Sequence, residues 1–235
     1  MTTSSRYPAA ELPPPAMLFD LDGTLIDSVY QHVIAWRNAL GRVGIDLSVW
    51  RIHRRIGMSG GLFVSALQRE MGLRLSPEEI TELQDLHAAE YIEQSASVRP
   101  LPGSIELLRS LTEWQVPWAI ATSGSMKTAG PTLEMLAVPD GVPIITRDLV
   151  RRAKPDPDLF LAAAEALGID PRLAMVIGDS VWDLLAARRA GALGIGLQSG
   201  GYGREELERA GAYRVYADPA DLLQRVDEIG LRPPM

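Results

Sequence analysis

Short apolar runs alternate along most of the chain with longer segments in which apolar residues recur every three or four positions. The short runs are typical of buried strands and the longer segments of amphipathic helices. We expect strands at residues 17–19, 117–121, 174–177, 193–197 and 213–216, and helices at residues 104–114, 128–136, 158–167, 181–190 and 220–229. This alternation predicts an α/β fold, a doubly wound parallel sheet covered by helices, with ligands beyond the carboxyl ends of the strands.

The segment from residue 30 to residue 98 departs from this alternation, because helical patterns follow one another there without a strand. Ser76, Pro77 and Glu79 predict one helix start, with an N-cap, a first-turn proline and a capping-box glutamate. We therefore expect an all-helical insertion at residues 30–98 in a core made of residues 16–29 and 99–235. Residues 1–15 are polar and proline-rich, and we expect a disordered or surface tail there.

Charge and composition narrow the range of possible partners and of possible metals. The net charge is −7 and no long Lys/Arg run is present, which argues against nucleic acid or an anionic membrane and favours a small molecule. The chain has no cysteine, so a metal must be held by oxygen or imidazole, which favours Mg²⁺. No apolar run approaches the roughly 20 residues of a membrane span. Without a signal-peptide pattern either, we expect a cytoplasmic protein.

Two carboxylates end the first predicted strand, in the order Asp20, Leu21, Asp22, Gly23 and Thr24. A phosphoryl acceptor must be ionised, whereas an acid that protonates a leaving alcohol must hold a proton. Such a pair therefore needs surroundings that separate the two pKa values, which a bound Mg²⁺ would favour. An Asp-x-Asp-Gly turn without function explains the same residues equally well.

Two further strand ends carry polar residues. Thr122, before Ser123 and Gly124, can bind a phosphate oxygen together with backbone N–H groups, although a Ser/Thr turn is an alternative. Lys154 is one of only two lysines in the chain and can neutralise a transferring phosphoryl group. We expect Asp156 to cap a helix that begins at Pro157, which would fix this lysine at a strand-to-helix corner.

The last strand end carries a second acid pair, in the order Gly178, Asp179, Ser180, Val181, Trp182 and Asp183. Asp179 can ligate a metal while Asp183, in the first turn of the next helix, supports the site. A helix cap alone would also explain Asp179.

Taken together, Asp20-x-Asp22-Gly23-Thr24, Thr122, Lys154-Pro155 and Gly178-Asp179-Ser180-x-x-Asp183 resemble the four signature motifs of the haloacid dehalogenase (HAD) superfamily. The resemblance extends from residue 17 to about residue 218 and is greatest to the phosphoglycolate phosphatase and β-phosphoglucomutase group. It implies a Rossmann-like core, a helical cap inserted after the first motif, and Mg²⁺-dependent hydrolysis of a phosphate monoester through an aspartyl-phosphate.

The resemblance also implies a role for each motif residue. Asp20 would attack phosphorus, and Asp22 would protonate the leaving oxygen and later activate water. Mg²⁺ would be bound by Asp20, Asp179 and the backbone carbonyl of Asp22, with Asp183 in support, while Thr122 and Lys154 would hold the phosphoryl oxygens. The remaining substrate- and phosphate-binding candidates are Gly23, Thr24, Ser123, Gly124, His32, Ser59 and Gly60.

Departures from the family patterns decide between reaction types. Dehalogenases of the superfamily lack an acid equivalent to Asp22, and its phosphonate-cleaving members use a cap lysine, which residues 30–98 lack. A sugar-phosphate mutase stays as an alternative, because His32 matches a histidine that approaches the acid in those enzymes. The mutases, however, have an arginine after the cap-loop serine, where this chain has Gly60 after Ser59.

A non-enzymatic phospho-accepting receiver module is an alternative from another class, but there the order of the motifs differs. The role of one further cluster is left undecided. It either attracts an anionic substrate or forms a solvated helix face. It consists of Arg51, His53, Arg54 and Arg55.

Overall fold

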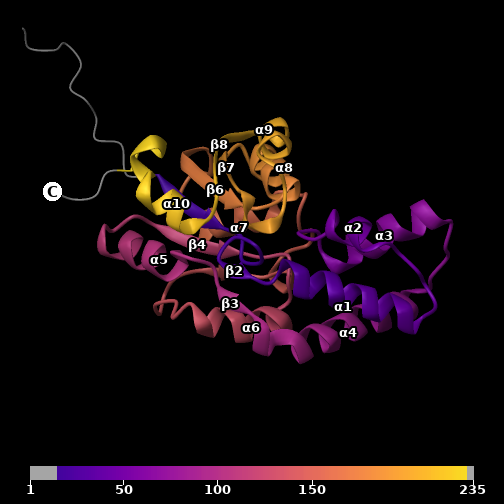
Figure 1. Cartoon of the computed structure of the whole chain (residues 1–235). Coiled ribbons are helices and arrows are strands. Elements are labelled where there is room, and N and C mark those ends of the chain that lie inside the picture. Colours follow the sequence, from indigo (N-terminus) through magenta and orange to yellow (C-terminus); the bar gives the residue numbers. More distant parts are fainter. Residues whose placement is uncertain (1–14, 232–235) are drawn as a thin grey trace, which may run out of the picture.

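A six-stranded parallel sheet forms the centre of the protein in the computed structural model, which describes residues 15–231 (Figure 1). The tail expected at residues 1–15 therefore lies, except for residue 15, outside the described residues. The strand order is β5-β4-β1-β6-β7-β8. The strands are β1 (Ala16–Phe19), β4 (Trp118–Ala121), β5 (Ile144–Ile145), β6 (Ala174–Gly178), β7 (Leu193–Leu197) and β8 (Ala212–Tyr216). The predicted α/β class and doubly wound parallel sheet are confirmed.

Strand β1 is central, with parallel neighbours on both sides. Its Phe19 is in register with Ile120 of β4 and with Ile177 of β6. The residues that follow these three strands therefore emerge at one edge of the sheet, which is the edge where α/β proteins bind ligands. This register brings sequence motifs more than a hundred residues apart to one place.

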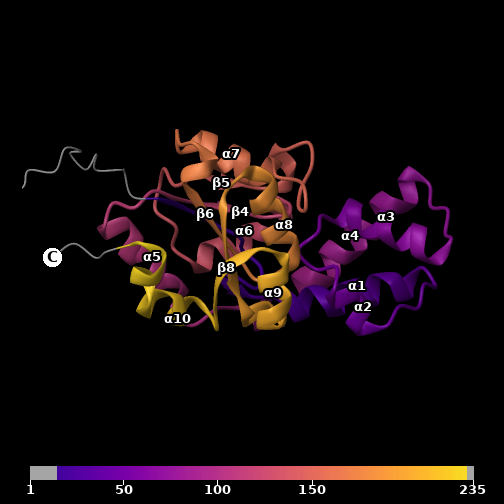
Figure 2. The same cartoon turned by 90° about the horizontal axis from the view of Figure 1, so that it is seen from above.

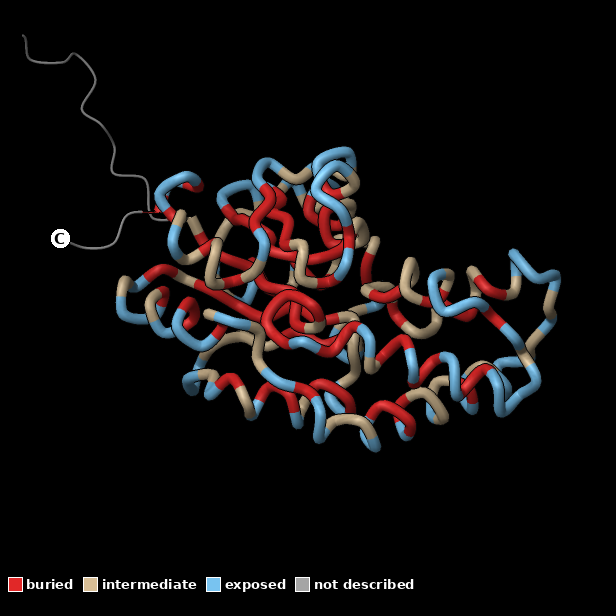
Figure 3. Tube along the Cα trace, viewed as in Figure 1, coloured by how far each residue is buried: buried red, intermediate tan, exposed pale blue. Residues whose placement is uncertain are grey.

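Helices cover both faces of the sheet (Figures 1 and 2). Along β1, Met17 and Phe19 pack against one layer and Leu18 against the other, as expected for side chains that alternate across a strand. The first layer contains α5 (Ser104–Glu113), α6 (Met126–Met135) and α10 (Pro219–Gln224), and the second contains α7 (Asp158–Ala166), α8 (Val181–Ala190) and α9 (Arg204–Ala210). Buried residues follow the strands and the inner sides of these helices (Figure 3).

A helical insert lies to one side of the sheet (Figures 1 and 2). It contains α1 (Val29–Arg42), α2 (Val49–His53), α3 (Gly60–Met71) and α4 (Pro77–Gln94), which share a core of their own around Trp36, Phe63 and Leu83. The chain leaves and returns through a short antiparallel pair, β2 (Ile26–Asp27) and β3 (Arg99–Pro100). The predicted capping box of Ser76 and Glu79 begins α4. Among the described helices, none combines the length and apolarity that a membrane crossing requires.

Several sequence predictions about local structure were wrong. Asp156 caps no helix: α7 begins at Asp158, after Pro157, without a side-chain cap. Lys154 lies in a loop that follows the 3₁₀ helix Arg147–Leu149, and the preceding strand, β5, ends at Ile145. Strand β5 has two residues, too few for a recognisable pattern. The helix expected at residues 220–229 is divided into α10 and the 3₁₀ helix Val226–Ile229.

Candidate active site

Three buried carboxylates converge at the carboxyl edge of the sheet. Asp20 follows β1, Asp179 follows β6, and Asp183 lies in the first turn of α8. Each offers one oxygen, and these atoms all lie within 4.8 Å of one another. The N-cap of α8 is Ser180, whose backbone N–H and hydroxyl donate to Asp183 Oδ2 at 3.0 and 2.5 Å. The alternative that Asp179 is only a helix cap is therefore wrong.

Lys154 supplies positive charge to this cluster. Its side chain is fully buried, forms an ion pair with Asp20, and places Nζ 2.8 Å from Asp183 Oδ1. Burial lowers the pKa of Lys154, but the two carboxylates outweigh burial and hold that pKa above its usual value. One lysine cannot neutralise three acids. Burial, together with the neighbouring carboxylates, therefore raises the pKa of Asp20 to about 7 and that of Asp179 well above its usual range.

The surroundings of Asp179 leave little free space. Thr24 Oγ1 donates to Asp179 Oδ1 at 3.1 Å. A Cβ atom at Gly200 would lie 1.7 Å from Asp179 Oδ2, and one at Gly23, whose φ is +82°, would lie 2.5 Å from the same oxygen. Thr24 therefore holds Asp179 in place, and the absence of a side chain at Gly23 leaves room for its carboxylate. The donor set is all oxygen, buried and short of positive charge, which fits a hard divalent cation such as Mg²⁺.

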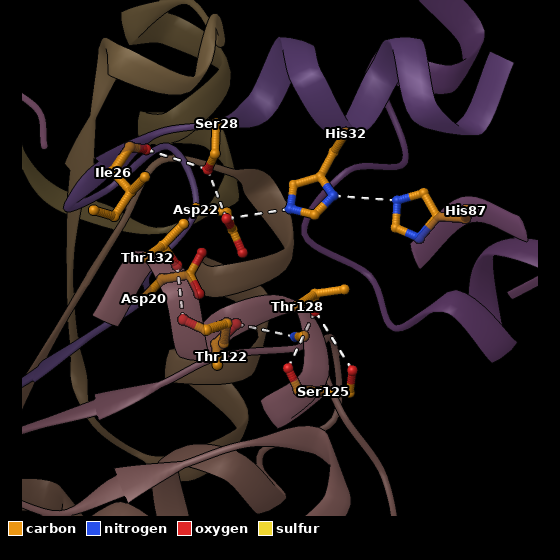
Figure 4. A network of polar contacts seen from close by, with 12 residues as sticks. Asp20, Asp22, Ile26, Ser28, His32, His87, Thr122, Ser125, Thr128 and Thr132 are labelled. Carbon is orange, nitrogen blue, oxygen red and sulfur yellow. Dashed lines mark hydrogen bonds and ion pairs between the residues drawn. The ribbon is translucent and has the colours of Figure 1, made fainter. Parts of the chain in front are cut away.

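Asp22 has a separate set of partners (Figure 4). Its Oδ1 accepts from Ser28 Oγ at 2.6 Å and lies 3.2 Å from His32 Nε2. Nδ1 of His32 in turn lies 3.1 Å from Nε2 of His87. Burial favours a higher pKa for Asp22, but His32 and Ser28 outweigh it and lower this pKa. Burial and the nearby His32 lower the pKa of His87 well below its usual value, so His87 is neutral at pH 7.

Sequence analysis missed His87. The signal lies in two matching four-residue spacings: His32 and Trp36 share one side of α1, and His87 and Tyr91 share one side of α4. The two pairs interlock, because the ring centroids of Trp36 and His87 are 4.2 Å apart and those of His32 and Tyr91 are 3.8 Å apart. Recognising this from sequence requires knowing that α1 packs on α4.

A pocket opens between the sheet edge and the helical insert. Of the predicted site residues, those that line it are Asp20, Asp22, His32, Gly60, Thr122, Ser123 and Gly124. The lining residues that were not predicted include Trp36, Gln84, His87, Ser125, Thr128 and Arg147, and Arg55 of the cluster left open above also lines the pocket. Lys154, Asp179 and Asp183 are buried and do not line it. Ser59 is likewise absent from the lining and serves as the N-cap of α3, accepting from the Leu62 N–H at 3.4 Å.

Thr122, in the turn after β4, fits both interpretations of this residue, the Ser/Thr turn and the phosphate-binding position. Its Oγ1 accepts from the Gly124 N–H at 3.0 Å, so the Ser/Thr turn is present, yet the residue also faces the pocket. The Ser123 hydroxyl is buried and has no hydrogen-bond partner among the described residues. It can therefore donate to an oxygen that enters the pocket.

Two members of the cluster of Arg51, His53, Arg54 and Arg55 connect the insert to the core, and the two others, Arg51 and Arg55, pair with Glu70 inside the insert. Arg54 pairs with Glu206 and lies over the ring of Tyr202, 4.2 Å from its centroid. The Arg54 carbonyl accepts from Trp182 Nε1 at 3.2 Å and from the Tyr202 hydroxyl at 3.1 Å. His53 Nε2 lies 2.8 Å from the Gly200 carbonyl oxygen. A solvated helix face is therefore the wrong interpretation for His53 and Arg54.

Comparison with known proteins agrees with this geometry. Residues 14–191 match the model of the haloacid dehalogenase-like hydrolase family. Hexitol phosphatase A from Escherichia coli is 34% identical over 176 residues, which cover 74% of this chain and 78% of that protein. Phosphoglycolate phosphatase from Rhodospirillum rubrum is 28% identical over 216 residues, which cover 89% of each protein. The solved structure of a hydrolase from Pseudomonas syringae is 51% identical, with a TM-score of 0.89, and the match covers 92% of this chain and 99% of that one.

The chain therefore belongs to the haloacid dehalogenase-like hydrolases. Within that family it is a phosphatase, an enzyme that hydrolyses phosphate monoesters.

Proposed function

We propose that this phosphatase requires Mg²⁺ and hydrolyses a small-molecule phosphate monoester, a sugar phosphate or a phosphorylated biosynthetic intermediate, through an aspartyl-phosphate on Asp20. The observation that carries the proposal is the separation of partners at the first motif. Asp20 contacts Lys154 and belongs to the buried acidic group, whereas Asp22, two residues on, is held by Ser28 and His32. Two carboxylates in one pocket thus have the different surroundings that two different roles require.

In this proposal Asp20 is the nucleophile. Lys154 orients its carboxylate and faces the phosphoryl group with positive charge. Mg²⁺, held by Asp20, Asp179 and the backbone carbonyl of Asp22 with Asp183 in support, would supply charge that keeps Asp20 ionised and stabilises the transferring phosphoryl group. An oxygen of Asp20 bonds to phosphorus while the bond from phosphorus to the leaving oxygen breaks.

Asp22 is the general acid and then the general base. It gives its proton to the leaving oxygen, and it later takes a proton from the water that attacks the aspartyl-phosphate and releases inorganic phosphate. In the free site the pKa of Asp22 is lowered, but the negative charge of a bound phosphate ester acts in the opposite direction. His32 and Ser28 keep the carboxyl group aimed at the leaving oxygen in the first step and at the attacking water in the second.

The phosphate oxygens would be held by Thr122, Ser123 and the turn at Gly124. Support for this assignment comes from the pocket position of all three residues and from the free hydroxyl of Ser123. The proposed cap, residues 30–98, would close over the substrate, exclude water and contact the leaving group through His32 and Gly60. Ser59 would act through the start of α3.

Hydrolysis is favoured over mutase chemistry. At Gly60 the chain has no side chain to grip a second phosphate on the cap loop, and the two relatives described above are named for hydrolysis of hexitol phosphates and of phosphoglycolate. A receiver module would accept a phosphoryl group without turning over an ester, so turnover separates the two classes.

The test is phosphate release from a panel of metabolite phosphates and an aryl phosphate. We expect turnover with Mg²⁺, none in chelator, and poor turnover with Ca²⁺, whose looser and larger coordination shell misplaces the nucleophile. Asp20→Asn should be inactive because an amide is a poor nucleophile. Full activity in chelator, or in the Asp20→Asn variant, would exclude the mechanism.

A further inference from the structure

Two arginines line the pocket, one from each side. Arg55 lies in the loop between α2 and α3 of the insert, and Arg147 begins the 3₁₀ helix Arg147–Leu149 that follows β5 in the core. Neither takes part in the chemistry proposed above. The Arg147 side chain is 36% exposed and that of Arg55 is 17% exposed, so both guanidinium groups can meet a ligand that enters the pocket.

Arg147 is tied to the phosphate-binding turn but lacks a close counter-charge. Its backbone N–H donates to the Gly124 carbonyl at 3.0 Å, and its Nη1 donates to the neutral amide oxygen of Gln84 at 3.3 Å. Among the described residues it pairs only with Asp148, whose Oδ1 lies 3.8 Å from Nη2, beyond hydrogen-bond distance. The other oxygen of Asp148 is occupied by the Met126 N–H at 2.8 Å.

Arg55 shares its counter-charge. Glu70 pairs with Arg55 through one carboxylate oxygen and with Arg51 through the other. One negative charge thus faces two guanidinium groups. Burial and the charge of Arg51 accordingly lower the pKa of Arg55. The insert side of the pocket therefore also has an excess of positive charge.

We infer that the leaving group of the substrate carries an oxyanion of its own, a carboxylate or a second phosphate, and that Arg147 binds it. This inference rests on the proposed function, because it assigns the part of the ester that lies beyond the reacting phosphoryl group. The planar guanidinium matches an oxyanion with two parallel hydrogen bonds, and Gln84 fixes its orientation from α4. Arg55 adds to the positive field that draws the anion into the pocket.

A purely structural role for Arg147 makes a different prediction. Its bond to Gln84 connects the core to α4, and in a purely structural role its loss would act only by loosening the insert. The chain offers a matched control, because Lys127 pairs from the core with Asp85, the next residue of α4, at 3.4 Å. Lys127 is not among the residues that line the pocket.

The experiment compares wild type with Arg147→Met, Arg147→Lys and Lys127→Met. The measured quantity is kcat/KM, with Mg²⁺, for phosphoglycolate and a hexose bisphosphate as anionic probes, and for a hexitol phosphate and an aryl phosphate as probes without a further charge. Wild type should prefer at least one anionic probe, which also shows whether the subsite takes a carboxylate or a phosphate.

Arg147→Met should lower kcat/KM for the preferred anionic probe by at least about tenfold, the loss typical of a charge-assisted hydrogen bond, mainly through KM. The other probes should change by less than about threefold. Arg147→Lys should recover part of the loss, and Lys127→Met should leave the ratio between probes unchanged.

Two results would overturn the inference while leaving the proposed function intact. One is hydrolysis of the two probes without a further charge in preference to both probes that carry one. The other is an equal loss on all probes in Arg147→Met, matched by Lys127→Met, which would make Arg147 a tie between insert and core. Absence of Mg²⁺-dependent hydrolysis of every probe, the aryl phosphate included, would instead remove the proposed function and the inference with it.

Discussion

His32, on the first helix of the insert, places Nε2 3.2 Å from Oδ1 of Asp22, the second acid of the first motif. A residue of the insert thus sets the electrostatic surroundings of a residue of the core. Behind it, His87 contacts Nδ1 and Tyr91 stacks on the ring (Figure 4 shows the two histidines).

We expect His32→Phe to raise the pKa of Asp22, because the variant keeps the stacking on Tyr91 but removes the partner that lowers this pKa. The limb of the kcat/KM–pH profile that reports Asp22 should move to higher pH. Activity should fall by about 10²-fold, within the range of general acid–base contributions. His87→Phe, which retains stacking on Trp36 and leaves His32 in place, should shift the same limb less. An unchanged pH profile in His32→Phe would separate His32 from Asp22.

The sequence predicts those residues of the site that directly follow a strand. Asp20, Thr122 and Asp179 each follow an apolar run, and parallel pairing of neighbouring strands brings such ends together. Lys154 could be identified by its motif, but its position in a loop could not, because residues 150–157 have no hydrophobic period.

The residues that sequence analysis missed act through contacts between distant elements. His87 matters because α4 packs on α1, and Arg147 because the loop after β5 meets α4. Trp182 matters because α8 meets the loop after α2. Such pairings are set by tertiary packing, which one sequence does not display.

Metal binding should depend on pH. The pKa of Asp20 is raised from 3.8 to about 7 without a metal, so the folded state holds a proton that the unfolded chain has lost. The metal-free protein should therefore lose stability as pH rises from about 4 to about 7. Mg²⁺ needs ionised carboxylates, so the rise in Tm that it causes should be larger at pH 8 than at pH 5.5.

Thermal unfolding in chelator and in saturating Mg²⁺ at both pH values measures this difference. A ligand at 100 times its Kd stabilises the folded state by about 2.7 kcal/mol at a given pH. Asp179→Asn removes one of the acids and should reduce both the Mg²⁺ effect and its pH dependence. An equal Tm shift at the two pH values would show that these carboxylates do not bind the metal.

Gly60→Arg should change the ranking of substrates more than it changes the pH profile or the metal requirement. A Cβ at Gly60 would lie 3.4 Å from Gln84 Cγ and 3.5 Å from Trp36 Cζ2, which are ordinary contacts, so a Cβ atom is accommodated and an arginine there adds charge to the pocket wall. Gly61→Arg is the matched control, because Gly61 is the next residue of α3 and is not among the pocket-lining residues. If Gly60→Arg ranks the substrates as Gly61→Arg and wild type do, this loop does not contact the leaving group.

Trp182 and Tyr202 should act together on the insert, because both donate to the Arg54 carbonyl. Either change to Phe leaves one donor, so each single variant should have a small effect on KM. The double variant should raise KM by more than the product of the single effects, by about fivefold for a bond of roughly 1 kcal/mol. Multiplicative effects of the two changes would show that the donors are not redundant.

The division of labour between Asp20 and Asp22 separates covalent catalysis from direct attack by water. Asp22→Ala removes the proton donor and the base of the second step. An activated aryl phosphate, whose leaving group needs little protonation, should still phosphorylate Asp20, while hydrolysis of the aspartyl-phosphate loses a typical 10²–10⁴-fold general-base contribution. Phosphoenzyme should therefore accumulate in this variant, whereas Asp20→Asn should form none.

Intact-mass analysis after an acid quench, with Mg²⁺ present during the reaction, measures the adduct directly. The Asp22→Ala protein should carry one added phosphoryl group, and the adduct should disappear when Asp20→Asn is combined with it. An adduct that persists in the double variant would place the acceptor on another residue. A burst of aryl alcohol from Asp22→Ala without any adduct would show that water attacks phosphorus directly. If a covalent intermediate formed and its hydrolysis were blocked, the phosphoryl group would stay on the protein and its mass would be detected.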